Sequence, residues 1–96
     1  MKRTWNTPEL RRLADALLTV PDRKAMIAFL RDLMTLEELR DTSSRWEVVR
    51  LLKQGLPYRD IAEKTSLSTT TVSRIAHWLR EGEGGYDDVY RLAKKK

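Results

Sequence analysis

Cysteine is absent from the 96-residue chain, and the only histidine is His77. Without cysteine there is no disulfide framework and no thiolate metal site. A lone histidine holds a metal only with partners at ligand spacing, and the sequence shows none. A glycine-rich phosphate loop and a serine placed after a strand, as a nucleophile would be, are also missing. We therefore expect no metal, no cofactor and no catalytic residue, and predict that the protein is not an enzyme.

Long apolar runs are missing as well. No run approaches the roughly 18 residues that a membrane span requires, and no secretory signal core is present. Apolar residues instead recur at helical spacing, and no segment has the alternation typical of a strand. The sequence therefore predicts a single all-α domain over residues 1–96, built from about six short helices. We expect it to be soluble and cytoplasmic, without a membrane partner.

Two short helices are expected first. Thr7 as cap and Pro8 as first helical residue start a helix that runs to about Thr19. The second helix, over residues 23–34, has an apolar arc wider than one packing partner requires. The arc consists of Met26, Ile27, Phe29, Leu30, Leu33 and Met34. A second subunit would cover it, so we predict a homodimer with its dimerisation helices within residues 7–54. A monomer with a broadly buried central helix is the alternative.

A third helix starts at a capping box, in which Thr35 caps the helix and Glu38 reaches back to the Thr35 amide. Residues 42–44, Thr-Ser-Ser, are weak helix formers, so we expect the helix to pause there. It then resumes and ends at Gly55. After a glycine-rich breaker, a last short helix is expected over residues 86–93.

Residues 58–80 have the pattern of a helix-turn-helix. A first helix is expected over residues 58–64, and a second follows Ser68, which caps it. Ser66 occupies the sharp turn, where glycine is common because positive φ costs it little, so we expect a slightly different or strained turn. The small side chain of Ala62 lets the two helices cross closely. The apolar residues expected to fill the wedge between the helices are Ile61, Leu67, Val72 and Ile75.

Positive charge is concentrated on the segment that contains this motif. The formal net charge is +5, and residues 45–81 hold seven Lys or Arg against four Asp or Glu. The segments before and after it each have an excess of only one positive charge. A basic surface favours phosphate binding because it releases counterions. Double-stranded DNA is therefore the expected partner.

The exposed face of the second motif helix, residues 68–80, supplies most candidate DNA-binding residues. Short hydroxyls there can reach phosphates or base edges, and Arg74 can read a guanine with two hydrogen bonds. His77 and two cations of the first motif helix, Arg59 and Lys64, are candidates for backbone contacts, although single surface cations are more often only solvated. The remaining candidates are Ser68, Thr69, Thr70, Thr71 and Ser73.

With these residues in place, the chain resembles the Trp repressor superfamily, most closely its YerC/YecD-like branch. The resemblance covers roughly Leu10 to Ala93. It rests on the Gly55 stop, on the Thr-Val-Ser-Arg run of the recognition helix, and on the segment DLMTLEELRDTSSRWEVVRLLKQGLPYRDIAEKTSLSTTTVSRI. It implies a bacterial transcription regulator with a Trp-repressor-like fold, an intertwined all-helical homodimer.

The resemblance also implies an effector pocket. In the Trp repressor, tryptophan is sandwiched by two arginines, and Arg45 and Arg74 occupy those positions here. Thr35 matches a threonine that lines the same pocket. The glycine that leaves room for the indole is replaced by Ile75, whose branched side chain should fill the space. We therefore expect tryptophan not to be a cofactor, and the presence of another small-molecule effector stays open.

These observations predict a sequence-specific, DNA-binding transcriptional repressor that associates with the nucleoid and binds a near-palindromic operator as a homodimer. A protein-interaction or dimerisation module that uses the helix-turn-helix only for packing is one alternative. A DNA-binding accessory factor is another, and the sequence does not separate it from a regulator. The basic excess on residues 45–81 argues against the first alternative.

Overall fold

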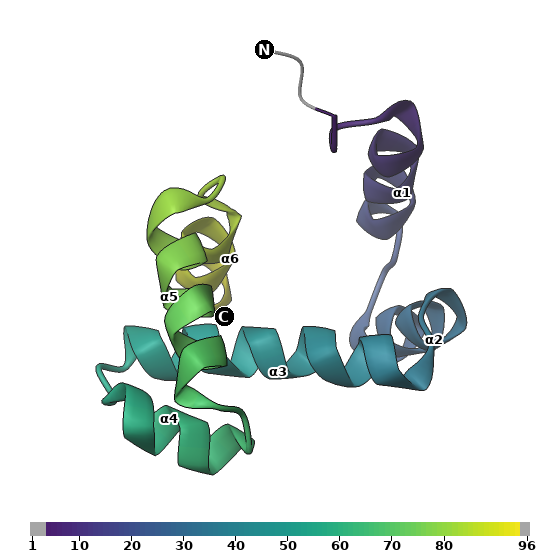
Figure 1. The fold of residues 1–96 in the computed structure, drawn as a ribbon. Coiled ribbons are helices and arrows are strands. Elements are labelled where there is room, and N and C mark those ends of the chain that lie inside the picture. Colours follow the sequence, from purple (N-terminus) through teal and green to yellow (C-terminus); the bar gives the residue numbers. More distant parts are fainter. Residues whose placement is uncertain (1–3, 95–96) are drawn as a thin grey trace. The chain divides into compact units, whose positions relative to one another are not determined.

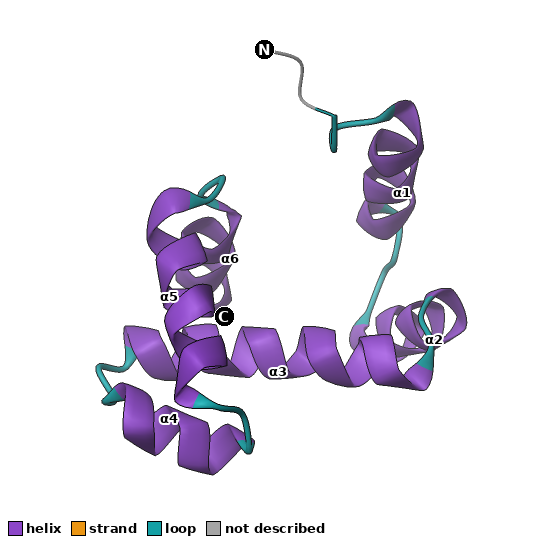
Figure 2. Cartoon of the chain, viewed as in Figure 1, coloured by secondary structure: helices purple, strands orange, loops and turns teal. Residues whose placement is uncertain are grey.

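The computed structural model describes residues 4–94, and this part of the chain is all-α, with six helices and no strand (Figures 1 and 2). The helices are α1 (Pro8–Leu18), α2 (Arg23–Leu33), α3 (Leu36–Lys53), α4 (Tyr58–Thr65), α5 (Thr69–Glu81) and α6 (Gly85–Lys94). The first and last residues of these helices lie close to the predicted bounds, apart from the interruption predicted within the third helix. None of the helices in the described range combines the length and apolar character that a membrane crossing needs.

Contacts between residues divide the chain into two compact units, one ending at Leu39 and one beginning at Arg40. The first unit contains α1, α2 and the start of α3. The second contains the rest of α3 together with α4, α5 and α6. The predicted helix-turn-helix therefore lies wholly within the second unit.

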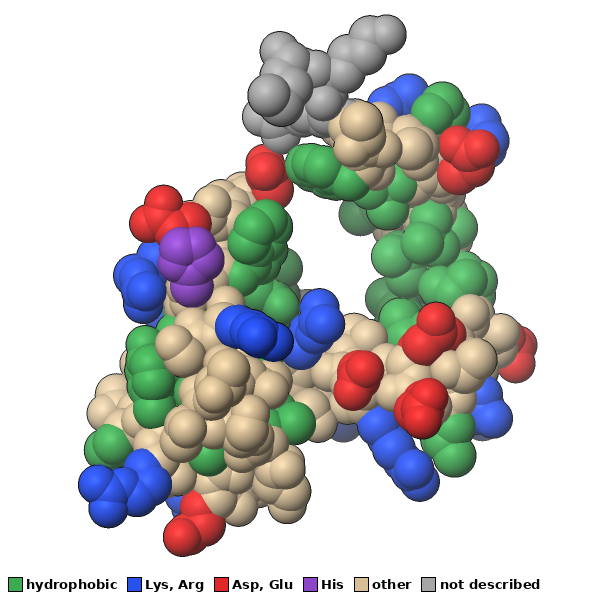
Figure 3. All heavy atoms as spheres, viewed as in Figure 1, with side chains coloured by type: hydrophobic (Ala, Val, Ile, Leu, Met, Phe, Trp, Pro, Cys, Tyr) green, Lys and Arg blue, Asp and Glu red, His purple; other side chains and the backbone are tan. Residues whose placement is uncertain are grey.

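The first unit has well-formed helix starts but no core. The Thr7 hydroxyl accepts a hydrogen bond from the Leu10 amide at 3.1 Å, and the Asp22 carboxylate accepts one from the Ala25 amide at 2.9 Å. These caps satisfy amides that have no partner within the helix. Neither α1 nor α2 has a buried residue, and Ile27 of the predicted apolar arc is 59% exposed. Hydrophobic side chains accordingly appear at the surface of this unit in Figure 3.

The predicted pause in the third helix is wrong, because α3 is continuous through residues 42–44. Weak helix formers cost only about 0.5 kcal/mol each, and a helix that is already nucleated extends through them. Two features favour continuity. The capping box is present, with mutual hydrogen bonds of 2.9 and 3.1 Å between Thr35 and Glu38. Downstream, α3 packs Val48 and Val49 into the core of the second unit.

Gly55 ends α3 as predicted. Its φ is +86°, a left-handed conformation that only glycine adopts readily. The Gly55 amide donates to the Leu52 carbonyl at 3.0 Å and the Leu56 amide donates to the Leu51 carbonyl at 3.2 Å. This pair of hydrogen bonds is the Schellman motif, which satisfies the last carbonyls of the helix and turns the chain toward α4.

The core of the second unit lies where α3, α4 and α5 meet. Its fully buried side chains are Val48, Val49, Ile61 and Val72. Leu51, Ile75 and Ala76 are also buried. Partly buried residues that pack against this core include Ala62 and Leu67 of the motif and Trp46, Leu52, Leu56, Leu79 and Tyr86. The predicted wedge between the motif helices is therefore confirmed.

Ser66, at the end of α4, adopts φ +61° and ψ +22°, and it is the only non-glycine residue with positive φ in residues 4–94. This left-handed conformation crowds the Cβ of an L-residue against its own backbone. The predicted strain in the turn is therefore present, and it lies at the point that sets the angle between α4 and α5.

Replacing Ser66 by Gly should raise the free energy of unfolding. Relief of the left-handed conformation is worth about 1–2 kcal/mol, and the larger unfolded-state freedom of glycine offsets roughly half of it. We expect a gain of about 0.5–1 kcal/mol in denaturant unfolding at fixed chain concentration. Ser66→Val is the matched control and should lower stability, because a branched side chain tolerates positive φ poorly. A Ser66→Gly protein no more stable than the original would show that the turn holds no strain.

Candidate nucleic-acid interface

Helix α5 has two contrasting faces. Val72, Ile75 and Ala76 are buried against α3 and α4, so these side chains fix the orientation of the helix about its own axis. Thr71 is half-buried, whereas the other predicted contact residues of this helix lie away from the buried stripe. Thr69, Thr70, Ser73, Arg74 and His77 are all exposed. The packing that buries one face of α5 therefore presents the other to solvent.

Ser68 starts α5 as predicted. Its hydroxyl accepts a hydrogen bond from the Thr71 amide at 3.1 Å and donates one to the Thr71 hydroxyl at 3.0 Å. Two of the candidate contact residues, Ser68 and Thr71, are thus hydrogen-bonded to each other, and this contact stabilises the start of α5. The remaining amides of the first turn point away from the helix and form a region of partial positive charge, which suits an anion.

The other candidates on α5 are more available. Within residues 4–94, the side chains of Thr69, Thr70, Ser73, Arg74 and His77 make no hydrogen bond or ion pair. On α4, the exposed Arg59 and Lys64 likewise have no ion pair with a described residue. The helix-turn-helix thus has Arg59 and Lys64 on its first helix, α4, and a hydroxyl-rich start on its second helix, α5.

Arg45 of α3 and Arg74 of α5 line one hollow of about 430 Å³ in the second unit, which we call the α3/α5 hollow. Ile75 also lines it and is only 7% exposed, because most of its side chain belongs to the core. Thr35, the third predicted pocket residue, lies in the first unit, where it caps α3. The structure therefore brings the two arginines together and assigns Thr35 a helix-capping role.

Trp78 of α5 is a further residue of this site. It is 56% exposed and lines the α3/α5 hollow. Its indole lies against the chain at Gly82, where an added Cβ would come within 2.9 Å of the indole nitrogen. Trp78 follows Arg74 by four positions, so helical spacing alone could have placed the two side chains on neighbouring turns.

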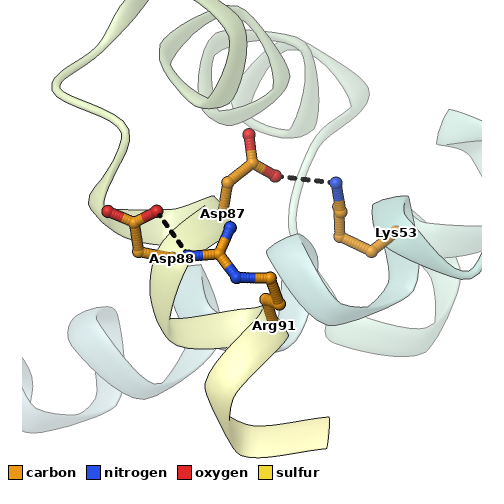
Figure 4. Close-up of polar contacts among 4 residues, drawn as sticks. All are labelled: Lys53, Asp87, Asp88 and Arg91. Carbon is orange, nitrogen blue, oxygen red and sulfur yellow. Dashed lines mark hydrogen bonds and ion pairs between the residues drawn. The ribbon is translucent and has the colours of Figure 1, made fainter.

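Tyr86 was not predicted as a site residue, yet it also lines the α3/α5 hollow. It belongs to α6, and its ring centroid is 6.4 Å from that of Trp46 on α3. An ion pair of 2.7 Å between Lys53 and Asp87 also links α3 to α6 (Figure 4). These residues are far apart in sequence, and no local signal indicates their contact.

Within residues 4–94, no group of three or more His, Asp or Glu side chains is arranged to hold a metal ion. The described site thus consists of an exposed polar helix face, a helix start capped by Ser68, and cations without an ion pair to a described residue. An all-α unit with a helix-turn-helix whose second helix presents such a face has the architecture of a DNA-binding regulator.

Comparison with known proteins defines the family. The family model described as Trp repressor protein matches residues 8–94. The chain is 34% identical over 79 residues to the Bacillus subtilis (strain 168) protein YerC, which is described as uncharacterized; the match covers 82% of this chain and 76% of YerC. The protein belongs to the Trp repressor family, in its YerC-like branch.

Solved structures agree with this assignment. A TrpR like protein from Eubacterium eligens ATCC 27750 superposes with a TM-score of 0.89 at 34% identity, over 97% of this chain and 96% of that one. A second structure, from Staphylococcus aureus, gives a TM-score of 0.87 at 30% identity, over 96% and 92% of the two chains. The all-α, Trp-repressor-like fold predicted from the sequence is confirmed.

Proposed function

We propose that the protein is a sequence-specific, DNA-binding transcriptional repressor with α5 as its recognition helix. The observation that carries this proposal is the exposed face of α5, opposite the buried stripe of Val72, Ile75 and Ala76. That face offers Arg74 for a guanine edge and the hydroxyls of residues 69–73 for bases or phosphates. Membership of the Trp repressor family supports it.

The distribution of charge supports the same partner. Residues 45–81 hold seven Lys or Arg against four Asp or Glu, and this segment contains the whole motif. Arg59 and Lys64 of α4 are exposed without an ion pair to a described residue, so neutralising a phosphate would cost them no internal contact. Cations of this kind contribute affinity that is independent of sequence and falls with salt.

We further propose that the protein acts as a homodimer on a near-palindromic operator. The apolar faces of α1 and α2 contain no buried residue, and a second copy would cover them. In such a dimer, two α5 helices about 34 Å apart would enter successive major grooves on one side of the duplex. The proposal includes a cytoplasmic, nucleoid-associated location and no catalytic activity.

Arg74 and Lys64 should affect DNA binding differently. Arg74→Ala should cost about 1–3 kcal/mol on the preferred sequence and relax the preference at one base pair, because a base contact is lost. Lys64→Ala should weaken all duplexes alike and reduce the slope of log affinity against log salt by about one, because a phosphate contact is lost. Both affinities would be measured by fluorescence anisotropy across a salt series.

The preferred duplex for this comparison would come from selection out of a random pool. If the original protein enriches no sequence over competitor DNA, the regulator proposal fails. A pulldown that recovers protein partners and no DNA would then favour an interaction module. If both variants lose affinity equally on all duplexes, the protein still binds DNA, but Arg74 is not the residue that gives sequence specificity.

Replacing Ile27 by Asp should dissociate the dimer. An exposed apolar residue on a free surface tolerates substitution within about 0.5 kcal/mol, whereas a carboxylate at a buried interface is strongly unfavourable. Sedimentation velocity should show a twofold fall in mass for Ile27→Asp. The control is Lys24→Glu, on the polar side of the same helix, which should leave the mass unchanged. A monomeric original protein would contradict the dimer.

Tryptophan should not stabilise the protein. A ligand that binds the folded state at 100 times its Kd adds about 2.7 kcal/mol to the free energy of unfolding, which raises Tm. Because Ile75 lies at the α3/α5 hollow where an indole would need space, we expect no change in Tm with millimolar tryptophan. A clear rise in Tm would mean that Ile75 leaves the site open.

A further inference from the structure

The second unit has a further hollow, between α3 and α6, which we call the α3/α6 hollow. Its volume is about 450 Å³, and it shares no lining residue with the α3/α5 hollow. Ligand sites commonly have volumes of about 300–1,000 Å³ and combine aromatic side chains with a few polar groups. The lining has this composition, and it consists of Trp46, Arg50 and Gln54 of α3 and Tyr90, Ala93 and Lys94 of α6.

The polar groups of this lining suit an anion. Arg50 contributes a guanidinium and Lys94 an ammonium, and none of the six lining residues is acidic. Lys94 makes no ion pair with a described residue. Arg50 donates to the Glu47 carboxylate at 2.9 Å, but these side chains are 40% and 50% exposed, and an exposed pair of this kind adds little stability. Both cations can therefore bind a phosphate at little cost.

Tyr90 holds two ammonium groups beside the hollow before any ligand binds. Its ring centroid is 5.8 Å from Nζ of Lys94, one turn later on α6, and 5.9 Å from Nζ of Lys53 on α3. Lys53 also forms an ion pair of 2.7 Å with Asp87 of α6 (Figure 4). A cation is attracted to the face of an aromatic ring, so these contacts restrain both lysines. Restrained side chains lose less freedom when they bind a ligand.

Trp46 supplies a flat apolar surface in the same hollow. It packs against the core, and its ring centroid is 6.4 Å from that of Tyr86, with the planes tilted by 36°. An indole fixed in this way is a platform on which a planar base can stack. A purine has two fused rings and covers more of an indole than a single ring does. The amide of Gln54 both donates and accepts, so it can pair with the polar edge of a base.

We propose that the α3/α6 hollow binds a purine nucleoside monophosphate, with the base on Trp46 and the phosphate between Arg50 and Lys94. A phosphate monoester carries a charge of about −1.5 to −2 at pH 7, which matches two cations better than the single charge of an internal phosphodiester does. The cores of protein interfaces are depleted of charged residues, which argues against a second copy of the chain as the occupant. The site does not depend on DNA binding by α5 and would remain if the protein bound no duplex.

Substitutions in the lining test the assignment of each group. Arg50→Gln and Lys94→Gln each remove one cation, and Ala93→Phe fills the hollow without adding an indole. Each should weaken nucleotide binding about tenfold. The matched control is Arg80→Gln, which removes the same charge from an exposed position of α5 that lines neither hollow and should change the affinity less than twofold. An unchanged Tm would show that each variant is folded.

The probes are adenosine and guanosine 5′-monophosphate, the two nucleosides, inorganic phosphate and a single-stranded deoxyadenosine decamer without terminal phosphates. Binding to the full chain would be followed by NMR titration of the three tryptophan indole N–H signals. We expect a nucleotide to shift the signal of Trp46 far more than those of Trp5 and Trp78. The nucleosides and inorganic phosphate should each bind at least tenfold more weakly than the nucleotide.

Several outcomes would overturn the proposal. Binding of neither nucleotide would reject it, and equal binding of nucleoside and nucleotide would remove the cations as phosphate partners. A larger shift at Trp78 than at Trp46 would place the ligand outside the α3/α6 hollow. A decamer that shifts the Trp46 signal at lower concentration than either nucleotide would make a nucleic-acid strand the occupant. If no nucleotide binds and Ala93→Phe halves the mass in sedimentation velocity, a second copy fills the hollow.

Discussion

The contact among Val48 and Val49 of α3, Ile61 of α4 and Val72 of α5 determines the orientation of α5, the proposed recognition helix. These four side chains are fully buried, and burying each one is worth about 1.5–3 kcal/mol. No polar side-chain atom in the described residues is buried without a partner, so nothing in the core opposes this gain. The candidate DNA contacts on α5 other than the half-buried Thr71 are presented to solvent, because the opposite face of that helix is packed into this core.

The two units of the chain differ in how much hydrophobic surface each one buries within itself. Among residues 4–94, the seven buried hydrophobic residues all lie in the second unit, whereas α1 and α2 contain none. Caps such as Thr7 and Asp22 define where these helices start, but a cap contributes only about 1 kcal/mol, and isolated helices of this length are marginal. Burial within the described part of their own unit therefore adds little to the stability of α1 and α2. In the proposed dimer, where a second copy covers them, stability would rise with protein concentration.

Local signals in the sequence predicted most of the fold. Thr7, Thr35 and Gly55 marked helix ends through hydrogen bonds that span only a few residues. The predicted pause at residues 42–44 was wrong because that prediction considered helix propensity alone. Packing further along α3 stabilises the continuous helix by more than the weak helix formers cost. The contribution of Tyr86 was missed because it depends on how α6 meets α3. That contact joins Lys53 to Asp87, 34 residues apart, and no periodicity records it.

Ile75 has a consequence for how members of this family can diverge. It belongs to the buried core and also lines the α3/α5 hollow. Changing it to glycine would remove a buried aliphatic side chain, at about 2–5 kcal/mol, and add about 1 kcal/mol for glycine within a helix. Natural domains are stable by only about 5–15 kcal/mol. Opening a slot by this one substitution would therefore remove a large share of the stability of the domain, which compensating core substitutions would have to restore.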